Sequence, residues 1–173
     1  MRLNIKNSIL LILRKLKILD RVPLGLRIVN FIFQRFFRVN SKLKIPMHFT
    51  SNISVARKVY FSKDINTMAS FATSGNCYIQ GYNGVYLGRN ILFAKGLNLI
   101  SANHNHKNLN RWDETKSIYI GDNVWIGANV TILPSVTIGN NCIIGAGSVV
   151  TKSFKDDNLV IAGNPARIIR KKA

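Results

Sequence analysis

Acidic side chains, cysteines and histidines are all scarce in this chain of 173 residues. Seven Asp and Glu stand against 25 Lys and Arg, so the formal net charge is +18. The two cysteines, Cys77 and Cys142, lack the spacing of a metal or redox motif, and a buried free thiol in a reducing compartment is the expected state of Cys142. Of the three histidines, His104 and His106 are neighbours and His48 lies far upstream, which is not the pattern of a three-histidine zinc site. No metal is therefore expected.

The sequence also lacks a long uncharged apolar run. None approaches the roughly 20 residues that a membrane-spanning helix needs. The apolar segment at residues 8–13 is too short for the core of a secretory signal, is followed at once by a basic cluster, and lacks a small-residue cleavage site. We therefore expect the protein to stay in the cytoplasm. The length suits one folded domain with an appendage.

A repeat of six residues dominates the C-terminal half of the chain. From residue 120 to residue 150 an aliphatic residue returns every six positions, and a small or apolar residue follows four places after it. The two series are Ile120, Ile126, Ile132, Ile138, Ile144 and Val150, and Val124, Val130, Val136, Cys142 and Ser148. This period is neither the 3.6 of a helix nor the alternation of a hairpin strand, and it predicts a parallel β-solenoid with one hexapeptide on each flat face. Gly and Asn at the corners fit, because both residues tolerate a positive φ.

A looser rhythm of six precedes this run and is then interrupted. The members are Ile53, Val59, Ile65, Phe71 and Cys77, and, after a phase slip at residues 80–84, Leu87, Phe93 and Leu99. We expect these stretches to form further coils. Residues 101–117 break the rhythm and hold two histidines, a tryptophan and two acids. An excursion of this kind from a rigid rod is where function is usually placed.

Positive charge is concentrated near the N-terminus. Residues 1–44 hold eleven Lys and Arg against one acid, Asp20, with aliphatic and aromatic residues between them. We expect helices at residues 5–19 and 24–37, separated by a turn. Such a segment can bind the inner face of an anionic membrane peripherally, or pack over the first coil with its charges in solvent. No nucleic-acid-binding motif accompanies the charge, so no nucleic-acid partner is expected.

These features divide the chain into two parts. Residues 1–48 are expected to be a basic amphipathic helical segment, and residues 49–173 a solenoid domain with a loop insertion at residues 101–117. The open end of a solenoid exposes unpaired strand edges that must be covered. We expect the tail, residues 167–172, to fold back over the last coil as a turn or short helix and so to form a short C-terminal cap.

Three segments resemble a known family. The run IGDNVWIGANVTILPSVTIGNNCIIGAGSVVTK, the upstream ISANH and the terminal AGNPARIIR are similar to the hexapeptide-repeat acetyltransferases, in particular the maltose/galactoside O-acetyltransferases and the capsule and exopolysaccharide O-acetyltransferases. The resemblance is strong over residues 87–170, rests on rhythm alone over 50–86, and does not include 1–48. It implies an all-β, three-sided, left-handed parallel β-helix. It also implies a homotrimer with active sites between subunits, and acetyl-CoA as co-substrate.

The resemblance assigns roles to individual residues. His104 falls on the family's catalytic histidine, with a structural loop histidine as the alternative. The positions that correspond to the coenzyme A site are Trp125, Ala128, Ala146, Thr151, Lys152, Arg167 and Arg170. The candidates for acceptor contacts are Tyr82, Asn83, His106 and Trp112. Other roles stay open: packing on the next coil for Trp125, fastening of the loop for Trp112, a solvated side chain for His106, and a solvated basic edge for Lys152, Arg167 and Arg170.

The implied reaction is the acetylation of a saccharide hydroxyl in a capsule, exopolysaccharide or O-antigen precursor. A hydroxyl is a poor nucleophile until its proton is removed, and an imidazole, which titrates near neutral pH, can remove it. His104 is the expected general base, oriented by a backbone carbonyl or by Asp113 or Glu114, with a backbone N–H as oxyanion donor. The alternatives are a small-molecule acceptor (serine, a free sugar or an antibiotic) and a solenoid without catalytic activity.

Overall fold

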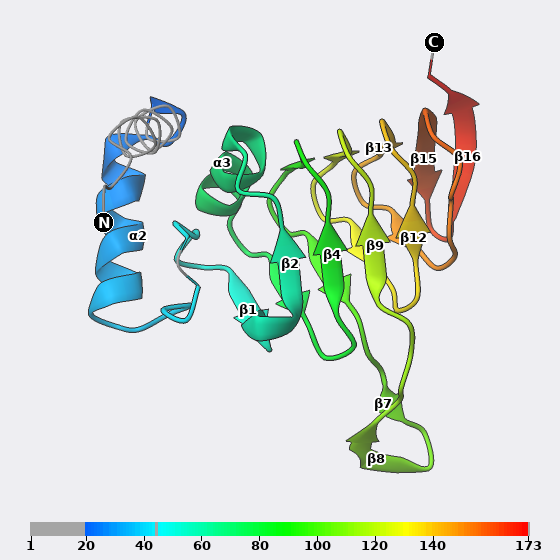
Figure 1. Ribbon diagram of the computed structural model, residues 1–173, viewed down its shortest axis with the longest axis horizontal. Helices are drawn as coiled ribbons and strands as arrows, with labels where there is room; N and C mark the ends of the chain where they lie inside the picture. The colour runs from blue at the N-terminus through cyan, green and yellow to red at the C-terminus, as the bar shows by residue number, and fades with distance from the viewer. Residues whose placement is uncertain (1–19, 44, 173) are drawn as a thin grey trace, which may run out of the picture.

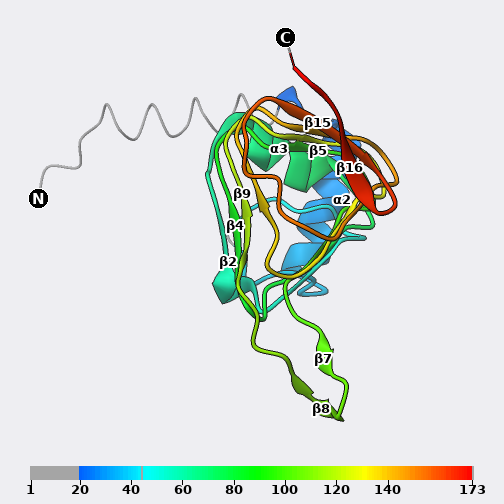
Figure 2. The ribbon, with the colours of Figure 1, turned by 90° about the vertical axis from the view of Figure 1, so that its right-hand side faces the viewer.

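The computed structural model describes residues 20–43 and 45–172. Its strands wind into a rod with three flat faces, seen from the side in Figure 1 and down the axis in Figure 2. Face A consists of β1 (Asn52–Ser54), β3 (Tyr78–Gln80), β6 (Asn98–Ile100), β11 (Thr131–Ile132) and β14 (Val149–Val150). Face B consists of β2 (Val59–Phe61), β4 (Val85–Leu87), β9 (Ile118–Ile120) and β12 (Thr137–Ile138). Face C consists of β5 (Leu92–Phe93), β10 (Trp125–Ile126), β13 (Ile143–Ile144), β15 (Leu159–Gly163) and β16 (Ala166–Lys171).

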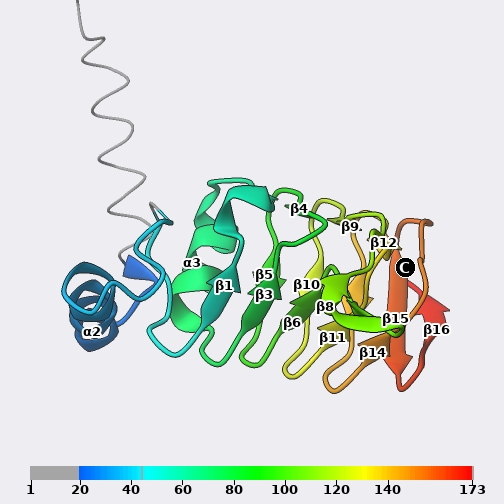
Figure 3. The same ribbon diagram turned by 90° about the horizontal axis from the view of Figure 1, so that it is seen from below.

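The chain visits the three faces in turn, which confirms the predicted solenoid. Neighbouring strands on each face are parallel, apart from the final pair β15 and β16. Figure 3 shows the face A strands following one another along the rod, with α2 at one end and β16 at the other. A parallel ladder of this kind needs a crossover between neighbouring strands, and here the crossover is one circuit of the coil.

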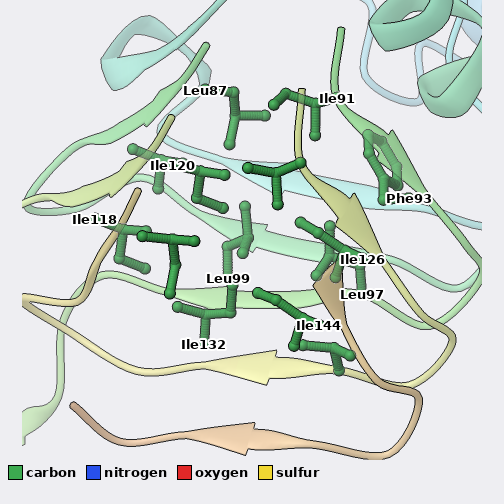
Figure 4. Packing of buried hydrophobic residues seen from close by; sticks show 14 of the residues in the cluster. Leu87, Ile91, Phe93, Leu97, Leu99, Ile118, Ile120, Ile126, Ile132 and Ile144 are labelled. Atoms are coloured by element: carbon green, nitrogen blue, oxygen red, sulfur yellow. The ribbon is translucent and has the colours of Figure 1, made fainter. Parts of the chain in front are cut away.

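Aliphatic side chains from all three faces fill the interior of the rod (Figure 4). The predicted inward series from Ile120 to Val150 is buried throughout, and so are the residues four places after each member. Because the register is parallel, Ile79, Leu99, Ile132 and Val150 stack in one row on face A. Burial of each such side chain contributes about 1.5–3 kcal/mol. The repeat therefore holds the rod together as well as shaping it.

Asparagines occupy left-handed corners of the coil, as the sequence predicts. Asn90, Asn123, Asn129 and Asn141 have φ values of 56–58°. On one edge their amides also join successive coils, because Asn90 Nδ2 donates to Asn123 Oδ1 at 2.7 Å and Asn123 Nδ2 donates to Asn141 Oδ1 at 3.1 Å. At this edge Asn therefore both adopts the positive φ that the corner requires and links one coil to the next through its side-chain amide.

The first coil departs from the prediction, because α3 (Ile65–Thr73) takes the place of a face C strand. Asp64 caps this helix by accepting a hydrogen bond from Thr67 N at 2.9 Å. The expected inward position of Ile65 was therefore wrong, and Ile65 is half-buried while Thr67 and Ser70 are fully buried. An aspartate before a run without Gly or Pro is a helix-start signal that the six-residue rhythm concealed.

Hydroxyl groups on α3 replace the missing strand along the edge of β5. Thr67 Oγ1 accepts a hydrogen bond from Ile91 N at 3.0 Å, and Ser70 Oγ accepts one from Phe93 N at 3.2 Å. Ser74 Oγ donates to Phe93 O at 2.6 Å. A helix cannot offer its backbone to a strand, so its side chains satisfy these buried groups.

The two ends of the chain differ from each other in structure. Two N-terminal helices were predicted. The first, at residues 5–19, lies outside the described residues, and the second is present as α2 (Leu24–Arg35). Within the described ranges no helix is long and apolar enough to cross a membrane. At the other end the expected turn or short helix at residues 167–172 was wrong, because β16 pairs antiparallel with β15. Only a strand can supply the row of backbone partners that the edge of β15 requires.

Candidate active site

The insertion forms a hairpin, here called the flap, that projects from the corner between faces A and B (Figures 1 and 2). Its two strands are β7 (His104–Asn105) and β8 (Asn108–Trp112), and they are antiparallel. Nearly all of their side chains are exposed. The flap therefore cannot be held by an apolar interior of its own.

A stack of three rings anchors the flap to the rod. Trp112 lies opposite His104 in the hairpin register, and their ring centroids are 3.8 Å apart. On its other side Trp112 stacks on Tyr82, with 4.2 Å between ring centroids and 23° between planes. Tyr82 belongs to the turn that follows β3, where the rhythm slips. The stack thus fixes the histidine relative to the coil, as the flap-fastening alternative for Trp112 supposes.

The imidazole of His104 is exposed, and one of its nitrogens is held by the flap itself. Nδ1 lies 2.6 Å from the carbonyl oxygen of Leu109. Because a carbonyl can only accept a hydrogen bond, Nδ1 carries the proton and Nε2 keeps its lone pair. Neither Asp113 nor Glu114 orients the ring, and Asp113 Oδ1 instead accepts a hydrogen bond from Asn105 Nδ2 at 2.8 Å. With Nδ1 held in this way, Nε2 is the ring nitrogen that remains available to another group.

Asn83 fastens the base of the flap. Its Nδ2 donates to the carbonyl of Asp113 and to Thr115 Oγ1, both at 2.8 Å. Its own carbonyl accepts from Ser117 Oγ at 2.6 Å. Both amide N–H groups of Asn83 are thus committed within the chain, which leaves only its side-chain oxygen for the acceptor contact that the resemblance implies. His106 is exposed at the turn between β7 and β8.

Small residues line the corner between faces C and A, here called the smooth corner. The strand register places Ala94, Gly127, Gly145 and Ala162 in one row, and Lys95, Ala128, Ala146 and Gly163 in the next. A Cβ built on Gly127 would meet Ala146 N at 2.5 Å, so only glycine permits this close stacking of coils. Next to this corner Trp125 projects outward from face C and is 55% exposed. Small side chains thus leave the backbone of this corner less covered than that of the flat faces.

In one chain the flap and the smooth corner do not meet. The flap leaves the rod between β6 on face A and β9 on face B, whereas Ala128 and Ala146 lie between face C strands and the following face A strands. The width of face A separates His104 from them. A single chain therefore does not bring together the base and the coenzyme positions that the resemblance implies.

Comparisons with known proteins identify the family. The model for bacterial transferase hexapeptide repeats (six repeats) matches residues 117–152. A lipopolysaccharide biosynthesis O-acetyl transferase of Escherichia coli K12, WbbJ, whose name is marked putative, is 30% identical over 153 residues, which are 80% of this chain and 76% of the relative. The chain belongs to the hexapeptide-repeat acetyltransferase family.

The chain is also similar to two other proteins of this family, but it covers less than two thirds of the length of each. Galactoside O-acetyltransferase of Escherichia coli K12 is 40% identical over 124 residues, which are 69% of this chain and 61% of that protein. The solved maltose O-acetyltransferase from Clostridium difficile 630 gives a TM-score of 0.52 at 30% identity, covering 75% of this chain and 64% of that chain. Membership implies that the parallel β-helix is left-handed.

Four residues that the resemblance assigns to the coenzyme, three of them basic, lie at the C-terminal end of this hexapeptide-repeat rod. Thr151 and Lys152 follow β14, while Arg167 and Arg170 lie on β16, and all four are exposed. Lys152 and Ile168 line one groove of about 380 Å³. Lys155 and Asp156 also line this groove, whereas Arg167 and Arg170 do not, so its positive charge comes from the two lysines. Over residues 20–43 and 45–172 no three His, Cys, Asp or Glu side chains gather in a way that could hold a metal ion.

Sequence reasoning expected a backbone carbonyl as one possible partner of His104 but could not name it, and it missed Thr115. The carbonyl of Leu109 orients His104, and no side-chain pattern marks a backbone carbonyl. Thr115 ties the flap to face A by donating from Oγ1 to Ser101 O at 2.9 Å while it accepts from Asn83. Both contacts depend on the path of the flap, which has no repeat from which the path could be inferred.

Proposed function

We propose that this chain transfers an acetyl group from acetyl-CoA to a hydroxyl group of a saccharide. The observation that carries the proposal is the exposed His104 imidazole, whose Nδ1 is held by Leu109 O at 2.6 Å while Nε2 is left to accept a proton. Two of the relatives are named galactoside O-acetyltransferase and maltose O-acetyltransferase. These names support a sugar hydroxyl as the acceptor. A saccharide precursor of capsule, exopolysaccharide or O-antigen is the proposed acceptor, and the name of the WbbJ relative supports it.

His104 is the general base of the proposed mechanism. Nε2 takes the proton of the acceptor hydroxyl while the hydroxyl oxygen attacks the thioester carbonyl carbon. The carbon–sulfur bond then breaks, and the imidazolium returns the proton to the departing thiolate. No acyl-enzyme forms, so no nucleophilic Ser or Cys is needed. A backbone N–H of the solenoid is the proposed donor to the oxyanion.

The smooth corner is the proposed site of the coenzyme. Apart from Lys95 at one end, its two rows consist of Ala and Gly, which leave backbone accessible to the pantetheine arm at Ala128 and Ala146, and Trp125 forms a wall beside them. At the C-terminal end, Thr151, Lys152, Arg167 and Arg170 are the proposed contacts of the adenosine phosphates. Tyr82, Asn83, His106 and Trp112 are the proposed neighbours of the acceptor.

A homotrimer is the proposed assembly, because one chain does not bring the flap to its own smooth corner. A neighbouring copy can present its smooth corner to the flap, and repeated head-to-tail contact of this kind closes a ring. The cytoplasm is the proposed location of the enzyme.

The proposed activity is tested by free thiol release from acetyl-CoA in the presence of galactosides, nucleotide sugars, lipid-linked oligosaccharides and serine. We expect release with at least one saccharide and its loss in His104→Ala. Release with serine alone would replace the saccharide proposal by a small-molecule one. Isothermal titration that finds no acetyl-CoA binding would contradict the enzyme proposal and leave a non-catalytic solenoid.

A further inference from the structure

Helix α2 turns its two amide side chains, Asn30 and Gln34, toward the protein. Asn30 is buried, where its Nδ2 donates to Ala72 O and its Oδ1 accepts from Phe49 N, both at 3.0 Å. One turn further on, Gln34 Nε2 donates to Ile45 O at 2.9 Å. These amides attach the helix to α3 and to the segment before β1. The polar side of α2 is therefore consumed by contacts within the chain.

The neighbouring side of α2 presents large apolar side chains to solvent, and Ile28 and Phe31 border the same cavity of about 450 Å³ as Asn30 and Gln34. Leu24, Ile28 and Phe31 share one side of the helix, at the spacing i, i+4, i+7, and are 63%, 52% and 60% exposed. Phe36 and Phe37 follow directly and are 72% and 68% exposed. We call these five residues the α2 apolar face. Single exposed apolar residues are ordinary, but a cluster of this kind marks a docking surface.

Basic side chains border the α2 apolar face. Arg35 is exposed on the same side of the helix as Leu24 and Phe31. Arg38, Lys42 and Arg57 line an adjoining groove of about 460 Å³, and no Asp or Glu is found among the described residues that line it. We call this groove the basic groove. It is suited to an anionic group such as a phosphate.

We infer that the α2 apolar face and the basic groove together dock on the surface of an anionic lipid bilayer. The apolar side chains enter the boundary between headgroups and acyl chains, and the basic groove lies against lipid phosphates. Exposed aromatic and aliphatic residues bordered by Arg and Lys form the composition of an interfacial helix. The inference is independent of acetyl transfer.

Charge favours a membrane over a second copy of this chain as the occupant. A symmetric contact through α2 would bring Arg35, Arg38 and Lys42 of two copies together. Residues 20–43 contain one acid, Asp20, to offset them. Like charges at an interface oppose association, whereas an anionic bilayer neutralises them.

The test is co-sedimentation of the full chain, without substrate, with two kinds of vesicle. One is phosphatidylcholine alone, and the other is equal parts phosphatidylcholine and phosphatidylglycerol. We expect binding to the anionic vesicles, and weaker binding at high salt because the charges are screened. Binding is measured apart from acetyl transfer, so its failure would leave the proposed activity untouched.

Two variants and one control locate the contact. We expect Phe31→Ser with Phe36→Ser to weaken binding at least about tenfold, because two exposed phenyl groups no longer enter the bilayer. Arg38→Gln with Arg57→Gln should lower affinity for the anionic vesicles by about tenfold. The matched control is Ile169→Ser on β16, which removes an equally exposed apolar side chain at the far end of the rod and should change nothing. Thermal unfolding should be alike in all variants, since these side chains are exposed.

Three results would overturn the inference. Full binding by the double Phe variant would place the contact outside α2, for example on residues 1–19. Equal loss in the Ile169→Ser control would indicate a general effect of surface hydrophobicity. No binding to either vesicle, together with a lower oligomeric mass of the double Phe variant in light scattering, would assign the α2 apolar face to a second copy of the chain.

Discussion

The coils from β9 to β14 and the flap that interrupts the rhythm before them are stabilised in different ways. In the coils, every sixth residue is an aliphatic side chain with almost no exposed surface. In the flap, Leu109 is 70% exposed, and order comes from the ring stack on Trp112 and from the hydrogen bonds of Asn83. In the proposed function, the coils supply a rigid surface that binds the coenzyme, and the flap supplies the side chain that reacts. A repeat cannot carry a unique base, whereas an insertion can.

The largest expected difference between coils and flap is in stability. A truncation in the coils should lower the free energy of unfolding, whereas one in the flap should hardly change it. Ile144→Ala opens a cavity at a fully buried position and should lower the free energy of unfolding by about 2–5 kcal/mol. Leu109→Ala in the flap keeps the backbone carbonyl that holds His104 and should cost less than about 0.5 kcal/mol. Chemical denaturation measures both values. Similar losses at the two sites would mean that the flap has an interior that the structure does not show.

The second prediction reverses the comparison, because turnover depends on the flap. His104→Ala should lower turnover at least about 100-fold and leave the affinity for acetyl-CoA unchanged, since the base is lost and the smooth corner is intact. Steady-state kinetics and isothermal titration provide the two readouts. The control is His106→Ala, which should lower turnover far less. Turnover that persists in His104→Ala would assign the base to another group.

The two tryptophans sharpen the division between binding and reaction. Trp112→Ala should lower kcat about tenfold with little change in KM for acetyl-CoA, because the ring that fixes His104 is removed. Trp125→Ala should instead raise KM for acetyl-CoA with kcat nearly kept. Trp112→Phe, which preserves a stacked ring, should recover most of the loss. If both alanine variants changed only KM, Trp112 would belong to the binding surface.

The smallest expected effect concerns Asp64, which joins α3 to the regular coils. Burial raises the pKa of this carboxyl, but hydrogen bonds from Thr67 N, Asn90 N and the Thr67 hydroxyl outweigh it, and the net pKa lies below the ordinary 3.8. A depressed pKa means that the stabilisation is present above 3.8 and is lost as the pH falls through the lower folded-state value. Asp64→Ala should therefore cost about 1 kcal/mol at neutral pH and less near pH 3. A cost independent of pH would show that the charge of Asp64 has no part in the cap.

The sequence was informative wherever the chain repeats. The buried series from Ile120 to Val150 and the left-handed asparagines follow from one period, because each residue meets the same environment in every coil. The first coil was less predictable, since residues 65–73 fit both a loose six-residue rhythm and a helix. Asp64 at the helix start decides between them only when the cap is recognised.

The sequence proposes the residues of the site, but it does not give their geometry. The context of His104 marks it, but its partner is the Leu109 carbonyl, and any residue has a carbonyl. Asn83 was expected near the acceptor, and its amide N–H groups hold the flap. The tail at residues 167–172 was expected to form a turn or short helix, but it forms part of β16. The reason is the unpaired edge of β15, which becomes apparent only when face C is assembled.

The central claim is that one copy's flap reacts at another copy's smooth corner, and subunit mixing tests it most directly. His104→Ala lacks the base, and Ala146→Trp fills the smooth corner, so each variant alone should be inactive. Unfolding the two together and reassembling them should restore activity to about a quarter of the wild-type value, since one in four contacts then pairs an intact flap with an intact corner. A mixture as inactive as its components, although assembled to the same mass, would contradict the claim.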